Sequence, residues 1–145
     1  MNIREITDQD FDGLMKLYTQ LHANPVPVRT PQLEALWQRI LNDPDHHIIV
    51  AEADGMLASS CVCVIIPNLT RDQRPYALIE NVVTDVCHRR QGLATACLNY
   101  AREIARAAHC YKMMLLTGAK DDDTLHFYTR AGYNRHDKTG FIQWL

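Results

Sequence analysis

The stretch YALIENVVTDVCHRRQGLA, residues 76–94, decides the fold. Its first half is rich in apolar and β-branched residues, which is typical of a buried strand. An amphipathic helix is predicted to follow over residues 92–109, because apolar residues recur there at helical spacing. A strand that runs into a helix presents free backbone N–H groups and the positive end of the helix dipole. The stretch therefore predicts an anion site, where Gly92 permits close approach to the backbone and Arg89 and Arg90 add charge-assisted contacts.

The segments on either side of this stretch alternate between helical and strand patterns. Thr7 with Asp10 and Thr30 with Pro31 each predict a helix start, and Asp54-Gly55 predicts a tight hairpin turn. The expected strands are residues 2–6, 46–53, 56–66, 76–86, 111–117, a short one around Tyr133, and 141–145; the expected helices begin near residues 7, 31, 92 and 123. The order β-α-α-β-β-β-α-β-α-β, in which the two short final strands are written as one, predicts an α/β fold, with a mixed, mostly antiparallel sheet flanked by helices, in one domain spanning 1–145.

Composition excludes several classes of function. The 145 residues are 47% hydrophobic and 22% charged, as in globular proteins, and their net charge of −2 disfavours a nucleic-acid binder. No apolar run is long enough to span a membrane, and the first residues lack a secretion signal. Five cysteines, an odd number, indicate reduced thiols in the cytoplasm, and each is expected to be a small buried apolar residue. No set of four converging ligands predicts a metal site.

Four segments of the chain together resemble the GNAT superfamily of acetyl-CoA-dependent N-acetyltransferases. They are Ile79-Glu-Asn-Val-Val-Thr-Asp85, His88-Arg-Arg-Gln-Gly-Leu-Ala94, Cys110-Tyr-Lys112 and Phe127-Tyr-Thr-Arg-Ala-Gly-Tyr133. The resemblance covers nearly the whole chain and implies acetyl-CoA as cosubstrate, without a metal. The segments before and including Ile-Glu-x-Val-Val, and Cys-Tyr-Lys, are locally similar to glucosamine 6-phosphate N-acetyltransferases.

The resemblance implies a binding role for each part of the central stretch. It implies that the backbone of Val82, Val83 and Thr84 holds the pantetheine arm beside a splayed or bulged strand, with one N–H polarising the thioester carbonyl. It implies that Arg74 and Tyr76 lie near an amino sugar or another small amine that carries an anionic group. It also implies that the coenzyme pyrophosphate is held by Arg89, Arg90, Gln91, Gly92, Leu93, Ala94 and Thr95.

Two side chains are candidates for proton transfer. In relatives, a Tyr at the position of Tyr128 protonates the departing thiolate, which suits a phenol with a pKa of about 10. Glu80 interrupts an apolar run, and a carboxylate there is costly unless it is paired or used. It is our candidate base for the amine, and the alternative is an outward-facing Glu paired with an Arg. The run Asp121-Asp-Asp123 is expected to cap a helix.

The sequence thus predicts an N-acetyltransferase that transfers the acetyl group directly to a small primary amine. Two alternatives remain open: a regulatory module that binds acetyl-CoA without turnover, and an enzyme that acetylates a protein amine. A covalent Cys-His-Asp mechanism through Asp85, Cys87 and His88 is disfavoured, because neighbours on a strand do not readily converge. A homodimer is expected, since small members of the superfamily often pair through terminal strands.

Overall fold

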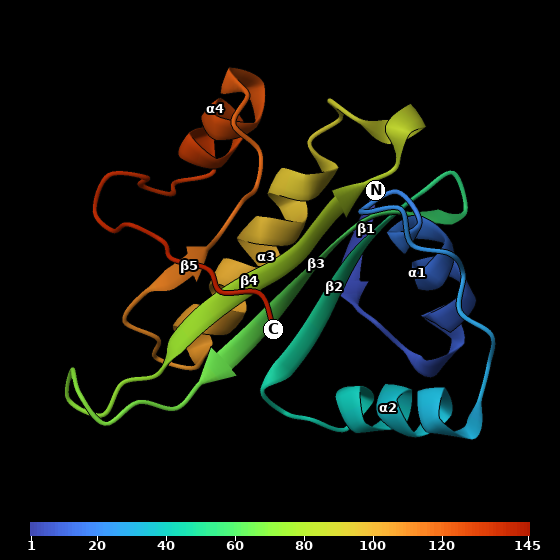
Figure 1. The fold of residues 1–145 in the computed structure, drawn as a ribbon, viewed down its shortest axis with the longest axis horizontal. Helices are drawn as coiled ribbons and strands as arrows, with labels where there is room; N and C mark the ends of the chain where they lie inside the picture. Colours follow the sequence, from blue (N-terminus) through green and yellow to red (C-terminus); the bar gives the residue numbers. More distant parts are fainter.

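A five-stranded sheet with helices on both faces forms the molecule (Figure 1). The computed structural model describes all residues, 1–145. Helices α1 and α2 cover one face of the sheet, and α3 and α4 cover the other. In chain order the elements are β1 (Asn2–Glu5), η1 (Asp8–Asp10), α1 (Phe11–Tyr18), α2 (Pro31–Leu41), β2 (His46–Ala53), β3 (Met56–Ile66), β4 (Tyr76–Thr84), η2 (Val86–His88), α3 (Leu93–Ala107), β5 (Met113–Leu115) and α4 (Asp122–Arg130).

The strands lie in the order β1-β2-β3-β4-β5. The first four are antiparallel neighbours, while β5 runs parallel to β4. Asp54 and Gly55 join β2 to β3 with φ values of 51° and 74°, the left-handed backbone that a two-residue hairpin turn requires. The expected α/β class and the mostly antiparallel sheet are confirmed.

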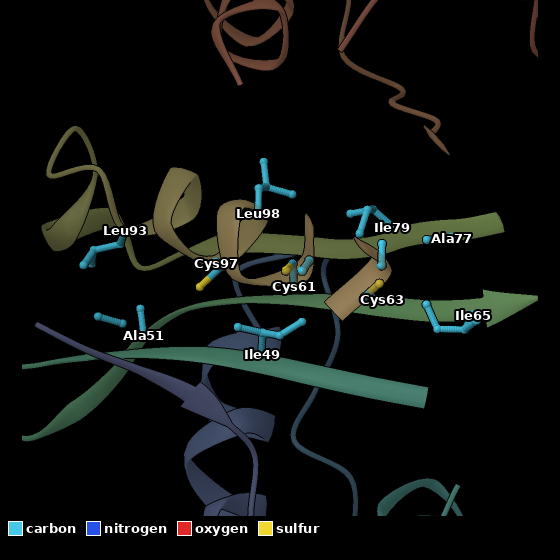
Figure 2. Close-up of a cluster of buried hydrophobic side chains, with 13 residues drawn as sticks. Ile49, Ala51, Cys61, Cys63, Ile65, Ala77, Ile79, Leu93, Cys97 and Leu98 are labelled. Atoms are coloured by element: carbon cyan, nitrogen blue, oxygen red, sulfur yellow. The ribbon is translucent and has the colours of Figure 1, made fainter. Parts of the chain in front are cut away.

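Two apolar clusters fix the helices to the sheet. The larger lies between α3 and the sheet, and Figure 2 shows its side chains pointing into the space between them. The smaller lies on the opposite face, under α1 and α2. The larger cluster contains Ile49, Ala51, Ala58, Cys61, Cys63, Ile65, Ala77, Ile79, Leu93, Cys97, Leu98, Ala101 and Ala105, and the smaller contains Phe11, Leu14, Trp37, Ile48, Val50, Leu57 and Val62.

Local capping rules set the helix starts as expected. Thr7 and Asp10 form a capping box at η1, with the Thr7 N–H donating to the Asp10 carboxylate at 2.7 Å. Leu33 N–H donates to Thr30 Oγ1 at 3.1 Å, and Pro31 occupies the first helical position of α2. The helix starts are therefore set within a few residues of sequence.

An ion-pair network ties the first strand to its neighbour. The Arg4 guanidinium makes two hydrogen bonds to Asp10, at 2.7 and 2.8 Å, and also contacts Glu52 on β2. The hydrogen bonds from Arg4 lower the pKa of Asp10 to about 2, against the opposing effect of burial. This network fixes β1 and the entry to α1 against β2.

Two expectations about the end of the chain and the cysteines are wrong. Residues 133–145 form no strand, and Phe141 and Trp144 are 91% and 85% exposed. A strand needs a hydrogen-bonded neighbour, and no segment of this chain pairs with those residues. Cys87 is exposed rather than buried, because it lies in a short turn outside the sheet. No helix has the length and apolar character needed to cross a membrane.

Candidate active site

A bulge interrupts β4 at the middle of the candidate site. Ser60 pairs with Val83 and Val62 pairs with Glu80. Between these two pairs β4 therefore has two residues where β3 has one. The extra residue is accommodated at Asn81, whose φ is 51°. This is the bulged strand that the family resemblance implies.

Beyond the bulge, β4 has one free edge. Its pairing with β5 ends at Ile79, opposite Leu115, so no strand covers that side of residues 80–84. Ser59 Oγ donates to the carbonyl of Val83 at 2.8 Å and lies 2.8 Å from the Thr84 hydroxyl, which fixes this end of the strand to β3. Residues 82–84 therefore lie along a strand edge that is open to an extended ligand.

The loop that follows presents a row of unpartnered backbone donors. None of the N–H groups from Arg89 to Thr95 donates within the chain, and the first bond of α3 runs from Ala96 N–H to the Gly92 carbonyl at 2.9 Å. Arg90 and Gly92 adopt left-handed φ values of 62° and 80°. A Cβ at Gly92 would meet no atom within 4 Å, so the surface above it is open. Such a row of donors at a helix N-terminus is suited to a phosphate group.

The arginine side chains of this loop add positive charge. Arg89 and Arg90 are exposed, and neither takes part in an ion pair. Arg89 Nε reaches the Thr84 carbonyl at 3.4 Å, a long contact that leaves the rest of the guanidinium free. The uncompensated charge favours an anionic ligand.

Behind this loop, Asp85 and His88 form a buried pair. His88 Nδ1 lies 2.8 Å from Asp85 Oδ1, and His88 Nε2 lies 3.2 Å from Asp54 Oδ2. Asp85, and then Asp54, raise the pKa of His88; hydrogen bonds from His88 first, then Gln20, lower the pKa of Asp85. Asp85 and His88 meet because a turn rather than the expected strand carries them, so the reason given against a triad does not apply to this pair. The Cys87 thiol makes no hydrogen bond to either, so no triad forms.

Tyr128 lies on α4, on the α3 face of the sheet. Its ring contacts Phe127 at 4.8 Å and stands edge-on to Tyr133 at 6.2 Å between centroids. All three pack against the apolar cluster that includes Cys61, the residue of β3 opposite the bulge. Burial, and then the nearby Cys61, raise the pKa of Tyr128, so the phenol keeps its proton at neutral pH.

Glu80 faces outward, as in the alternative expected for it, but no Arg pairs with it. It is exposed, and it makes neither a hydrogen bond nor an ion pair. Because it pairs with Val62, it points to the α1–α2 face, opposite Tyr128. The bulge therefore separates a free carboxylate on one face of the sheet from a phenol on the other.

Arg74 and Tyr76 occupy different environments. Arg74 donates to the carbonyls of His109 and Cys110, at 3.1 and 3.0 Å, and so fixes the loop before β4 to the end of α3. The Tyr76 ring stands edge-on to Tyr111 at 6.3 Å. The structure thus gives Arg74 a tethering contact and gives Tyr76 an aromatic one.

Two positively charged side chains lie near the rings of Tyr76 and Tyr111. Lys112 Nζ lies 5.2 Å from the centroid of Tyr76 and 5.4 Å from that of Tyr111, and the Arg71 guanidinium lies 5.6 Å from Tyr111. Neither cation has a carboxylate partner. Arg71 begins three consecutive left-handed residues, 71–73, a backbone conformation that is costly for residues with a Cβ.

Sequence reasoning missed a polar group at the bulge. Tyr18 on α1 lies beside Ser60 and Asn81, and burial raises its pKa to about 12. The hydroxyls of Tyr18 and Ser60 are buried without a well-formed hydrogen bond. The two serines within an otherwise apolar β3 were the available signal. No three His, Cys, Asp or Glu side chains come together as a metal site.

Comparison with known proteins gives consistent matches. Residues 11–133 match the family model described as "Acetyltransferase (GNAT) family". The structure is similar to a putative acetyltransferase from Agrobacterium tumefaciens str. C58, with a TM-score of 0.92 and 36% identity over 100% of both chains. It also shares the fold of glucosamine-6-phosphate N-acetyltransferase from Arabidopsis thaliana, with a TM-score of 0.87 and 22% identity over 99% of this chain and 97% of that one.

A curated relative matches over a shorter span. Glucosamine 6-phosphate N-acetyltransferase from Trypanosoma brucei brucei is 34% identical over 84 residues, which are 58% of this chain and 55% of the relative. The match therefore covers about half the length of that protein.

Proposed function

The chain belongs to the acetyltransferase (GNAT) family of N-acetyltransferases, and we propose that it moves the acetyl group of acetyl-CoA directly to a primary amine of a small molecule, with an amino sugar as the favoured class. The observation that carries the proposal is the continuous open surface at the end of β4. The free edge of that strand leads into the loop whose N–H groups, Arg89 to Thr95, lack acceptors.

Acetyl-CoA would bind along this surface. In the proposal, the pyrophosphate takes the N–H groups of the loop and the start of α3, since an anion there meets donors and the helix dipole. The pantetheine amides take the backbone of Val82, Val83 and Thr84 as an added strand would. The bulge at Asn81 supports this, because it turns β4 away from the regular pairing that would cover its edge. The proposed contacts with the coenzyme are those of Val82, Val83, Thr84, Arg89, Arg90, Gln91, Gly92, Leu93, Ala94 and Thr95.

The proposed reaction begins with loss of a proton from the substrate ammonium. Glu80, directly or through a water molecule, accepts this proton, and its exposed, unpaired carboxylate supports the role. The amine nitrogen then attacks the thioester carbon to form a tetrahedral intermediate. A backbone N–H of β4 near Val82 to Thr84 donates to its oxyanion.

Collapse of the intermediate breaks the carbon–sulfur bond. The electron pair leaves with sulfur, and Tyr128 donates its phenolic proton to the thiolate. The nitrogen, which became cationic on attack, releases its extra proton to solvent, so that a neutral amide forms. Its raised pKa keeps that proton available at neutral pH. The positions of Glu80 and Tyr128 on opposite faces support an amine entering from one side while the thiol leaves on the other.

An anionic group on the amine substrate is proposed to lie near Tyr76, at the start of β4. Lys112 and Arg71 supply charge without a competing carboxylate, and the curated relative is named for a phosphorylated amino sugar. Tyr76 and Glu80 are four residues apart on the same face of β4, a span of about 13 Å before side chains reach inward. Arg74 would act by holding this loop in place.

Calorimetric titration with acetyl-CoA, followed by thiol release across a panel of amines, tests the proposal. Binding with amine-dependent thiol release is expected. Binding without release from any small amine would favour the regulatory module or a protein acceptor, and peptide amines would then separate these two. No binding would overturn the proposal.

A pair of variants tests the substrate class. Lys112→Met is expected to raise KM for glucosamine 6-phosphate about tenfold, with little effect for glucosamine, because one charge-assisted contact is lost. Lys120→Met, which removes an exposed lysine elsewhere, is the control. Equal effects of Lys112→Met on both sugars would exclude the anion contact.

We also propose a homodimer and a cytoplasmic setting. The exposed Phe141, Ile142 and Trp144 form an apolar terminal segment without a partner, which a second copy could cover. The five free cysteines favour a reducing compartment. Light scattering at several concentrations tests the dimer, and a monomer throughout would exclude it.

A further inference from the structure

His88 has a carboxylate opposite each ring nitrogen. Nδ1 lies 2.8 Å from Asp85 Oδ1, and Nε2 lies 3.2 Å from Asp54 Oδ2. An ionised carboxylate only accepts hydrogen bonds, so both contacts are made only when both ring nitrogens carry protons. The geometry therefore specifies a charged imidazolium. A neutral ring can donate to one of the two carboxylates and must lose the other.

The pair belongs to a network that joins three parts of the molecule. Gln20, just beyond α1, donates to Asp85 Oδ2 at 2.6 Å and accepts from Val86 N–H at 2.8 Å. Cys87 N–H donates to Asp85 Oδ1 at 3.0 Å. Asp54 supplies the contact from the β2–β3 turn. Since the free N–H groups begin at Arg89, these bonds fix the segment from which the anion-binding loop emerges.

Three other charged side chains line the cavity beside Asp85. Asp10 and Glu52 line the cavity beside Asp85, but both are paired with Arg4. Lys16 on α1 lines the same cavity and forms no ion pair. Asp85 and Asp54 are therefore the carboxylates available to His88.

We propose that charged His88 is a positioning residue for the coenzyme. Its two hydrogen bonds join residues 85–88 to Asp54 in the β2–β3 turn, so that the loop of residues 89–95 keeps its N–H groups toward the pyrophosphate. The inference rests on the proposed function. Loss of the His88 proton releases one contact, and the loop then samples arrangements that do not fit the anion. Coenzyme affinity is highest below the pKa of His88 and falls as pH rises through it.

Titration calorimetry with dephospho-acetyl-CoA from pH 6 to pH 9 tests this. The probe lacks the 3′-phosphate, which itself titrates in this range with a pKa of about 6. The wild-type Kd is expected to rise about tenfold across the range, as when one charge-assisted hydrogen bond is lost. His88→Gln is expected to bind weakly at pH 6 and to show little further change. His136→Gln, in the exposed terminal segment, is expected to follow the wild type.

Asp54→Asn tests the same hydrogen-bonded pair by a second route, in case His88→Gln does not fold. The Asp54 side chain is 87% exposed, so its replacement leaves the core intact, and the affinity loss is expected to begin at lower pH than in the wild type. Parallel pH curves for wild type, His88→Gln and Asp54→Asn would overturn the inference and leave the proposed function standing. Failure of the wild type to bind at every pH would overturn both.

Discussion

Gly92→Ala tests whether the backbone of residues 89–95 binds the pyrophosphate of the coenzyme. Gly92 has φ 80° and ψ 5°, and an added Cβ meets no atom within 4 Å. The free protein therefore accepts the methyl group without a clash, and the cost comes from the left-handed backbone alone. That cost is about 1–2 kcal/mol for a residue with a Cβ.

Gly92→Ala should also weaken coenzyme binding, independently of its effect on the free energy of unfolding. The methyl group lies at the helix entry where the pyrophosphate is proposed to approach, so it pushes the phosphate away from the nearest N–H groups. A hydrogen bond to a charged group contributes about 1.5–3 kcal/mol, so losing one such bond raises Kd about tenfold or more. A larger side chain at this position should weaken binding further.

Gly55→Ala is the matched control for Gly92→Ala. Its φ of 74° is close to that of Gly92, and its Cβ also meets nothing within 4 Å, so both variants should lose similar stability in chemical denaturation. Calorimetry should show weaker acetyl-CoA binding for Gly92→Ala alone. Equal affinities for both variants and the wild type would refute the assignment of the loop to the pyrophosphate.

The remaining predictions concern single side chains. Tyr128→Phe should lower kcat by about 10²-fold with unchanged coenzyme Kd, while Tyr133→Phe should not; unchanged turnover would remove Tyr128 as the acid. Glu80→Gln should lower the rate most at acidic pH, where few amines are deprotonated, and the exposed Glu103→Gln serves as control; an unaltered pH–rate profile would exclude Glu80 as base. Asp10→Asn should lower the free energy of unfolding at pH 7 by about 1 kcal/mol after solvent screening, as measured by urea titration. Because the pKa of Asp10 falls from 3.8 to about 2, this contribution is present above pH 3.8 and is lost toward pH 2, where variant and wild type should converge.

Features that depend on neighbours in sequence were predictable. The Thr30 cap, the Asp54-Gly55 turn and the capping Asp121, whose side chain accepts from Thr124 N–H at 2.8 Å, each follow from residues within three positions. The strand-to-helix stretch of residues 76–94 belongs to the same class, since a local pattern sets both the element type and the free donors between them. This is why the free N–H groups of residues 89–95 could be predicted from the sequence.

Features that depend on distant residues were not predictable from one sequence. Gln20 meets Asp85 across 65 positions, and Asp54 meets His88 across 34, and no local pattern indicates either contact. Glu80 was expected to serve as the base or to pair with an Arg, because a carboxylate among apolar sequence neighbours is costly otherwise. Its orientation follows instead from the register of β4 against β3, which the bulge changes at the next residue.

The strand predicted for residues 141–145 is wrong for the same reason, because a strand needs a partner that its own sequence does not identify. Residues 141–145 carry the apolar and aromatic residues typical of a strand, but a strand is a property of a pair, and the pattern does not say where the partner is. Within this chain β5 offers a ladder of only three residues, and residues 141–145 lie unpaired with Phe141, Ile142 and Trp144 exposed. Exposed groups of this kind are costly for an isolated chain, which supports the homodimer proposed above.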